Sequence, residues 1–245
     1  SATPGSGTIT AAMIASGLQL GTIDAQNNTL LGSTAGDSFT GTDANNNTLI
    51  GQAAGTAITT GDDNTAVGSI ALDATTTGSN NDAFGRNSLG ANTTGDKNVA
   101  LGASALANNT TASYNTAVGH TALIANTTGT LNTAVGYQAL DANTTGNYNT
   151  AVGVNALGAN TTAEDNAAFG YGALETNTTG THNSAFGYGS LQVNSTGANN
   201  TAVGNAALDA NTTASDNTAV GHIALTTNTT GAGNTALGSN SMRFC

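Results

Sequence analysis

The chain of 245 residues carries 3 basic and 14 acidic side chains, a formal net charge of −11, 33 glycines and no tryptophan. So few large side chains cannot fill the core of a compact enzyme domain of this length. Three basic residues cannot neutralise many phosphates, so we expect no nucleic-acid partner. No stretch approaches the roughly 20 apolar residues of a membrane span, so we also expect no membrane insertion.

The first segment, residues 1–27, lies outside the regular pattern of the chain. Its part from Thr8 to Ile23 is modestly apolar and reads as a strand. Such a strand can pair with the sheet edge of a neighbouring subunit or cover an edge of its own chain. We therefore predict a strand-exchange or capping element. Its candidate assembly residues are Ile9, Met13, Ile14, Leu18 and Leu20.

Residues 28–245 form a repeat. A 19-residue unit, 28–46, comes first, and 17-residue units follow without insertion from Asn47 onward. Asparagine opens each unit and glycine takes its fifth position, as in Asn132 and Gly136 and again in Asn149 and Gly153. Fixed spacing of this kind is typical of a solenoid, in which each unit stacks on its neighbours.

A 17-residue unit is too short for a strand and a helix. The chain has no Asn-Gly or Asp-Gly dipeptide, the usual signal of a two-residue hairpin, so parallel stacking is favoured over antiparallel pairing. The sequence predicts an all-β fold, a parallel β-solenoid (β-roll or β-helix) of about twelve 17-residue coils. Eleven steps of about 4.8 Å give a rod roughly 53 Å long.

Within a unit, positions 2–5 and 7–10 are predicted to be strands. Position 4 is large and apolar, position 9 is mostly leucine, and positions 3 and 8 are small. Either the large or the small residues can face the interior, and an apolar stripe is left outside in both cases. We therefore expect the solenoid to be oligomeric through lateral contacts. The predicted structural ladders are represented by Asn132, Ala134, Val135, Gly136, Leu140, Asn149, Val152, Gly153 and Leu157.

The surface positions leave two interpretations open. Tyr137, Tyr171 and Tyr188 share position 6 and either stack as structural residues or contact a cell-surface or carbohydrate ligand. The Asn-Thr-Thr corners either supply turn hydrogen bonds or serve as N-glycosylation sequons. No histidine, cysteine or carboxylate cluster has metal spacing, and no catalytic constellation is present. We therefore predict no cofactor, no metal and no catalytic residue, and the protein is not expected to be an enzyme.

The last unit stops at its twelfth position, with Met242, Phe244 and Cys245 near the end. An uncovered coil is an open sheet edge, so we expect these residues to take part in assembly, including head-to-tail fibre growth. Cys245 is either a free end or one half of an interchain disulfide. At the other end, Ser1 without a basic leader is consistent with a processed secreted protein or a trimmed chain.

The blocks NTAVGYQAL and NTAVGHTAL, followed by NTTG, resemble the repeats of phage and bacterial tail-fibre-like proteins. They are similar, more distantly, to the head repeats of trimeric autotransporter adhesins. The resemblance covers residues 47–242. It implies a trimeric, left-handed parallel β-roll that extends from a particle or cell and adheres.

Together these observations favour an extracellular structural protein, a self-assembling subunit of a filament or surface fibre. Its partner would be a further copy of itself, and its location extracellular or on a cell or virion surface. The alternative is a trimeric adhesin or tail-fibre-like attachment module. A second alternative is an ice-binding protein, although the adjacent threonines of the corner, such as Thr144 and Thr145, would point to opposite sides of an extended strand.

Overall fold

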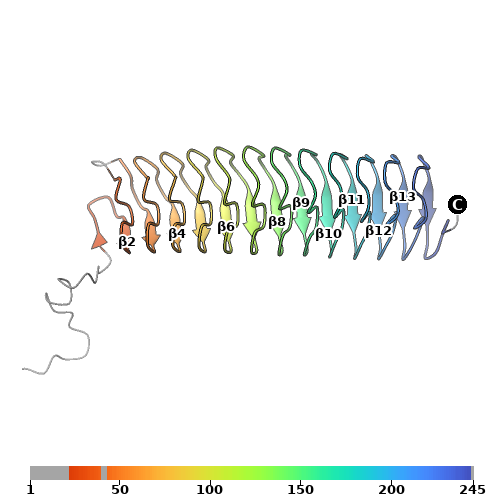
Figure 1. The fold of residues 1–245 in the computed structure, drawn as a ribbon, viewed down its shortest axis with the longest axis horizontal. Coiled ribbons are helices and arrows are strands. Elements are labelled where there is room, and N and C mark those ends of the chain that lie inside the picture. The colour runs from red at the N-terminus through yellow and green to blue at the C-terminus, as the bar shows by residue number, and fades with distance from the viewer. Residues whose placement is uncertain (1–21, 40–42, 244–245) are drawn as a thin grey trace, which may run out of the picture.

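The computed structural model describes residues 22–39 and 43–243, which form a long, narrow rod (Figure 1). A single sheet of fourteen strands runs along the rod in chain order, and its thirteen strands β2 to β14 are parallel. The prediction of a parallel β-solenoid of about twelve coils is therefore confirmed. The strands are β1 Thr22–Ile23, β2 Thr29–Leu31, β3 Thr48–Ile50, β4 Thr65–Val67, β5 Asp82–Phe84, β6 Val99–Leu101, β7 Thr116–Val118, β8 Thr133–Val135, β9 Thr150–Val152, β10 Ala167–Phe169, β11 Ser184–Phe186, β12 Thr201–Val203, β13 Thr218–Val220 and β14 Thr235–Leu237.

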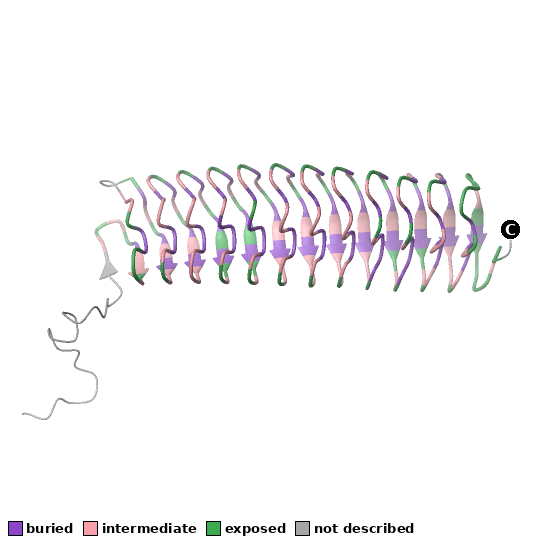
Figure 2. Cartoon of the chain, in the orientation of Figure 1, coloured by how far each residue is buried: buried purple, intermediate pink, exposed green. Residues whose placement is uncertain are grey.

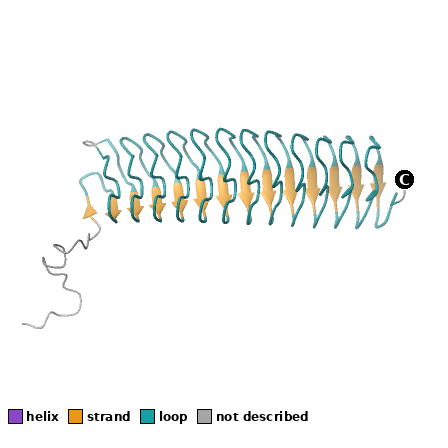
Figure 3. Cartoon of the chain, in the orientation of Figure 1, coloured by secondary structure: helices purple, strands orange, loops and turns teal. Residues whose placement is uncertain are grey.

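Each strand occupies positions 2–4 of its unit, and equivalent residues of successive coils pair with one another. In β8 and β9, for example, Thr133 pairs with Thr150 and Val135 with Val152. All strands thus lie on one side of the rod, and turns form the rest of each coil (Figure 3). Because the register is the same at every step, each side-chain type forms a column parallel to the rod axis.

The second strand that we expected at positions 7–10 does not form. Gln138 and Leu140, at positions 7 and 9, both have positive φ, 54° in each case. In a strand, neighbouring side chains point to opposite faces. Here Ala139 and Leu140 are adjacent and both fully buried. The turn therefore places two consecutive side chains in the interior, which an extended strand cannot do.

The core of each coil is thin. Ala134, Ala139 and Leu140 are completely buried, whereas Val135 is only half-buried on the outside of the sheet. The same burial pattern recurs in coil after coil (Figure 2). Leucine at position 9 fills most of the interior, so only alanine fits opposite it at position 3. The interior thus takes the small residues of the strand together with the leucines of the turn, and the large residues at position 4 remain outside.

At the N-terminal end of the rod, β1 pairs antiparallel with β2. Asp24 follows β1, and its carboxylate accepts hydrogen bonds from the main-chain N–H and the side-chain Nδ2 of Asn28, each 2.9 Å long. The carboxylate thereby takes the place of an asparagine from a preceding coil. In the described ranges 22–39 and 43–243, no helix has the length and apolar character that a membrane span requires.

The assembly residues predicted near the two ends are mostly beyond the described ranges. Ile9, Met13, Ile14, Leu18 and Leu20, and at the other end Phe244 and Cys245, lie outside the described residues. Met242 is described, and its side chain is 40% exposed beside the last coil.

Candidate interaction surface

The solvent side of the sheet carries two columns of side chains, which we call the outer face. Because side chains alternate along a strand, residues at positions 2 and 4 point outward while position 3 points into the core. Position 2 is mostly threonine, and position 4 is valine, phenylalanine, leucine or isoleucine. The position-4 column consists of Ile50, Val67, Phe84, Leu101, Val118, Val135, Val152, Phe169, Phe186, Val203, Val220 and Leu237. Several of these large apolar side chains are well exposed, among them Leu101 at 49% and Phe186 at 41%.

The outer face is almost free of charge. From β3 to β14, Asp82 is the single ionisable residue at positions 2 and 4 of the strands. Most other carboxylates within the repeats lie on turns, at positions 10, 16 and 17, as do Asp141, Glu164 and Asp165. A chain with a net charge of −11 therefore presents one long face on which a second surface meets a single carboxylate, that of Asp82.

A ladder of buried asparagines at position 1 supports one edge of the sheet. The main-chain N–H of Asn149 donates to Oδ1 of Asn132 at 3.0 Å, and Nδ2 of Asn149 donates to the carbonyl of Ala163 at 2.8 Å. Both side chains are buried. Buried amides are tolerated only when they are hydrogen-bonded, and each asparagine here joins its own coil to the one before it. The ladder therefore holds neighbouring coils together at this corner beside the sheet.

A second asparagine ladder, at position 12, was missed by the sequence analysis. Nδ2 of Asn143 donates to Oδ1 of Asn126 at 3.0 Å and to the carbonyl of Gly146 at 3.1 Å. Asn143 is fully buried. These are the asparagines of the Asn-Thr-Thr corners. They supply turn hydrogen bonds, and in the folded chain their side chains are buried and therefore inaccessible for glycosylation. The recurrence of asparagine at position 12 is the sequence pattern from which this ladder could have been predicted.

The threonines of the corner differ in what they contact. Oγ1 of Thr144, at position 13, donates to the main-chain carbonyl of Thr161 in the next coil at 3.0 Å. Thr145, at position 14, is exposed. Hydroxyls at position 13 therefore stabilise the stack, and those at position 14 form an exposed row along the corner.

An aromatic cluster interrupts the regular surface at β10 and β11. Phe169 stacks on Phe186 with ring centroids 4.8 Å apart, and Tyr171 stacks on Tyr188 at 5.2 Å. Tyr137, the third candidate contact residue, stacks on His120 at 5.8 Å. In each pair one face of each ring is covered by its neighbour, and the three tyrosines remain about half-exposed. The structure thus brings Tyr171 and Tyr188 together and places Tyr137 apart from them.

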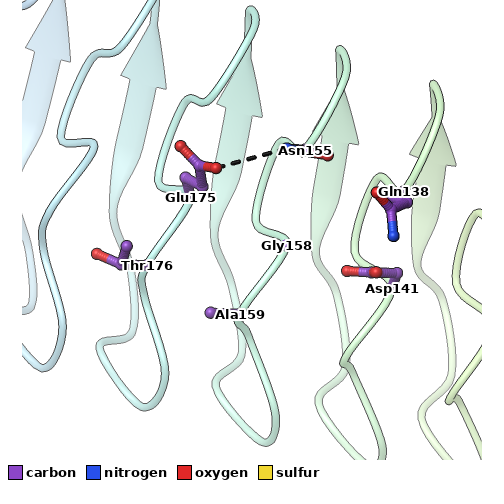
Figure 4. A pocket seen from close by; sticks show the side chains of 7 residues that line it. All are labelled: Gln138, Asp141, Asn155, Gly158, Ala159, Glu175 and Thr176. Atoms are coloured by element: carbon purple, nitrogen blue, oxygen red, sulfur yellow. Dashed lines mark hydrogen bonds between the residues drawn. The ribbon is translucent and has the colours of Figure 1, made fainter.

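A shallow hollow of about 340 Å³ opens on the turn side of the rod, lined by Gln138, Asp141, Asn155, Gly158, Ala159, Glu175 and Thr176 (Figure 4). It exists because Gly158 takes position 10, where the coils on either side carry Asp141 and Glu175.

Polar groups surround this hollow. Nδ2 of Asn155 lies 3.5 Å from Oε1 of Glu175, whose Oε2 accepts a hydrogen bond of 2.7 Å from Gln192. Oδ1 of Asn155 is buried without a hydrogen-bond partner. Burial raises the pKa of Asp141, although hydrogen bonds from the adjacent backbone and Gln138 partly offset this. Within the part of the chain that the structure describes, no three His, Cys, Asp or Glu side chains gather as a metal-binding group.

Comparison of the chain with protein-family models, curated proteins and solved structures gave no match. The resemblance to tail-fibre-like and adhesin repeats therefore rests on the repeat motif. The outer face of the sheet runs along the rod from β3 to β14, and the aromatic cluster lies on and beside it at β10 and β11.

Proposed function

We propose that this chain is a structural subunit that assembles with further copies of itself into an extracellular fibre or filament. The observation that carries the proposal is the outer face, on which one apolar column continues from Ile50 to Leu237 with one charged residue beside it. Large continuous apolar faces on soluble proteins are commonly interaction surfaces. The extracellular location is supported by the repeat motif alone.

The construction of the rod fits a mechanical role. Neighbouring coils are joined by main-chain hydrogen bonds and by the position-1 asparagines, and from Asn92 to Asn228 also by the position-12 asparagines. Solenoids of this kind derive their stability from contacts between neighbouring units, so the rod keeps its form along its whole length. A rigid rod with a uniform side is suited to spanning a distance and to packing beside identical rods.

An attachment module is the second candidate, and the aromatic cluster favours it. Tyr171 and Tyr188 are about half-exposed, and Phe186 lies close to them on the same two coils. Exposed aromatic side chains are enriched at binding sites because they offer a large contact area and a polar tip. In this role the rod would position the cluster at a distance from a particle or cell.

Size as a function of concentration tests the proposal. Purified full-length protein would be imaged by negative-stain electron microscopy over a concentration series, and its mass measured by sedimentation velocity on the same samples. Self-assembly predicts dimers or larger bodies that grow with concentration. Monomers of 23.7 kDa at every concentration would overturn the proposal. A fixed trimer would favour the attachment module.

A further inference from the structure

We propose that the outer face of β3 to β14 packs against the same face of a second copy of this chain, with the two rods antiparallel. The two-fold axis of the pair runs parallel to the strands and passes between β8 and β9. This inference rests on the proposed self-assembly and specifies the surface, the partner and their relative direction. A second copy is the occupant because the face complements itself in area, charge and side-chain size.

The area of the face reaches the lower end of what a specific dimer needs. Twelve strands about 4.8 Å apart give a length of roughly 58 Å, and two outward columns with their side chains give a width of roughly 11 Å. The product is about 640 Å² per copy. Specific interfaces bury about 1,200–2,000 Å² in total, so a pair that buries this face on both copies lies at the lower end of that range. One of the two columns is mostly threonine, so the apolar column accounts for about half of the area.

The charge distribution also favours a second copy. Two chains of net charge −11 repel each other over most of their surfaces. Repulsion across the outer face is small, because this face carries one carboxylate and the other carboxylates of the repeats lie mostly on the turns. Asp82 is the exception, and at the rim of a packed pair its carboxylate would remain hydrated. Like charges placed opposite one another would cost several kcal/mol, and the outer face avoids that contact along nearly its entire length.

The direction of the rods follows from the symmetry of two columns. A two-fold axis along the rod sets the apolar column of one copy on the threonine column of the other. An axis along the strands sets the apolar column on the apolar column, and it reverses the second rod. Apolar side chains gain most by burial against each other, at about 25 cal/mol per Å² of apolar surface. The antiparallel pair is therefore the more stable closed arrangement, with one self-complementary patch on each copy.

The register is fixed by the sizes of the side chains. When the axis lies between β8 and β9, all twelve strands overlap and β3 faces β14 of the second copy. Phe84 then faces Val203, Phe169 faces Val118, and Phe186 faces Leu101. No phenylalanine meets another across the axis. Large side chains opposite smaller ones can interdigitate as they do in packed cores. Full overlap and size complementarity select the same register.

A charge on the face tests the surface. Val135→Asp places a carboxylate at the centre of the pair, and because Val135 is half-buried on the outside of the sheet the fold tolerates the change. Thr145→Asp adds the same charge at an exposed corner and is the matched control. Sedimentation velocity should show the wild type and Thr145→Asp as dimers. Val135→Asp should raise the dimer dissociation constant at least about 100-fold with an unchanged circular dichroism spectrum.

Cross-linking tests the direction. In a Cys245→Ser background, the double variant Ile50→Cys, Leu237→Cys should form disulfide-linked dimers, because the antiparallel register sets position 50 opposite position 237 of the second copy. The two positions lie at opposite ends of one rod and cannot link within a chain. Neither single variant should cross-link at the same rate. Dimers without the double-variant cross-link would overturn the antiparallel register.

The outcomes separate this inference from the proposed function. A monomeric wild type overturns both. A wild type that assembles while Val135→Asp assembles equally well overturns the outer face as the interface and leaves self-assembly standing. A fixed trimer overturns the two-fold pair. Dimers that dissociate only with Val135→Asp and that cross-link through positions 50 and 237 establish the inference.

Discussion

The main-chain N–H of Asn149 and Oδ1 of Asn132, in neighbouring coils, are joined by a hydrogen bond of 3.0 Å in a fully enclosed corner. The same relationship recurs at most steps of the rod, as between Asn217 and Asn200. A side chain thus supplies a further hydrogen bond between coils beside those of the backbone. The outer face stays regular because this corner repeats without change.

Removing one member of this ladder should lower stability. In Asn149→Ala the N–H of Asn166 loses its acceptor in a buried corner, and the carbonyl of Ala163 keeps only the donor from Asn160. An unsatisfied buried group costs about 1–3 kcal/mol, so we expect a loss of about that size in the free energy of unfolding. Chemical denaturation followed by circular dichroism measures this. Thr145→Ala, at an exposed position, is the control and should change stability by less than about 0.5 kcal/mol.

Glycine at position 5 should be irreplaceable. Gly136 has φ of 139°, and a Cβ built on it would lie 2.5 Å from the carbonyl oxygen of Gly153 in the next coil. Gly136→Ala would therefore force neighbouring coils apart as well as strain the backbone, which alone costs about 1–3 kcal/mol. We expect a lower midpoint of thermal unfolding or insoluble protein.

Gly158→Ala is the matched control for that substitution. A Cβ at Gly158 would meet nothing nearer than 3.3 Å, and it would point into the hollow between Asp141 and Glu175. We expect the midpoint of thermal unfolding to stay within a few degrees of the wild type. Equal losses in both variants would contradict the packing argument for Gly136.

The sequence was sufficient to predict the solenoid and its phase, because Asn and Gly recur at fixed positions of every unit and a parallel stack preserves that spacing. It was not sufficient to decide which residues face the interior. Ala134 and Val135 are both apolar, and hydrophobicity alone would favour burying the valine. The choice depends on Leu140, which enters the core from the turn and leaves room only for alanine.

The turn itself could not be predicted from residue types. Gln138 and Leu140 adopt positive φ, which non-glycine residues rarely do, and they remain there because burial of Leu140 and its hydrogen bond to Ala156 compensate the strain. Similarly, the sequence left two interpretations of the position-12 asparagines open, an N-glycosylation sequon and a turn residue that bonds the backbone. Only the folded coil, in which these side chains are buried and hydrogen-bonded, decides between the two interpretations.

Acid should weaken the N-terminal cap. Desolvation acts to raise the pKa of Asp24, but the hydrogen bonds from Asn28 and Gln26 outweigh it and hold the pKa below its usual value. A carboxylate with a depressed pKa contributes stability above the pKa of the unfolded chain, about 3.9, and loses it as the pH falls through the folded-state pKa. Hydrogen exchange of the Asn28 amide should therefore accelerate below about pH 4.

The Asn149 amide, which is bonded to a neutral asparagine, is the internal control and should show no added acceleration over this pH range beyond the intrinsic one. Asp24→Asn should abolish the acid effect at Asn28 and weaken its protection at neutral pH. An Asn28 amide whose protection is independent of pH would contradict the role of the carboxylate.

Asp141 should behave in the opposite way. Burial raises its pKa, so the ionised carboxylate disfavours the folded state and stability falls as the pH rises through the raised value. Asp141→Asn should consequently raise the midpoint of thermal unfolding at pH 7 and leave it nearly unchanged near pH 3, where the wild-type carboxyl is protonated. A lower midpoint at pH 7 would show that the ionised carboxylate stabilises the hollow.

The folded chain should carry no N-glycan on its position-12 asparagines. Asn143 is fully buried, and its Nδ2 is held by Asn126 and Gly146, so a sugar there would break the ladder. Asn199 begins a second kind of sequon, Asn199-Asn200-Thr201, and its side chain is exposed. After expression in a eukaryotic secretory pathway, mass spectrometry of soluble protein should find glycans at Asn199 and none at Asn143. Occupied Asn143 in correctly folded rods would contradict the buried ladder, whereas Asn199→Gln should remove the glycan at that sequon and leave the fold intact.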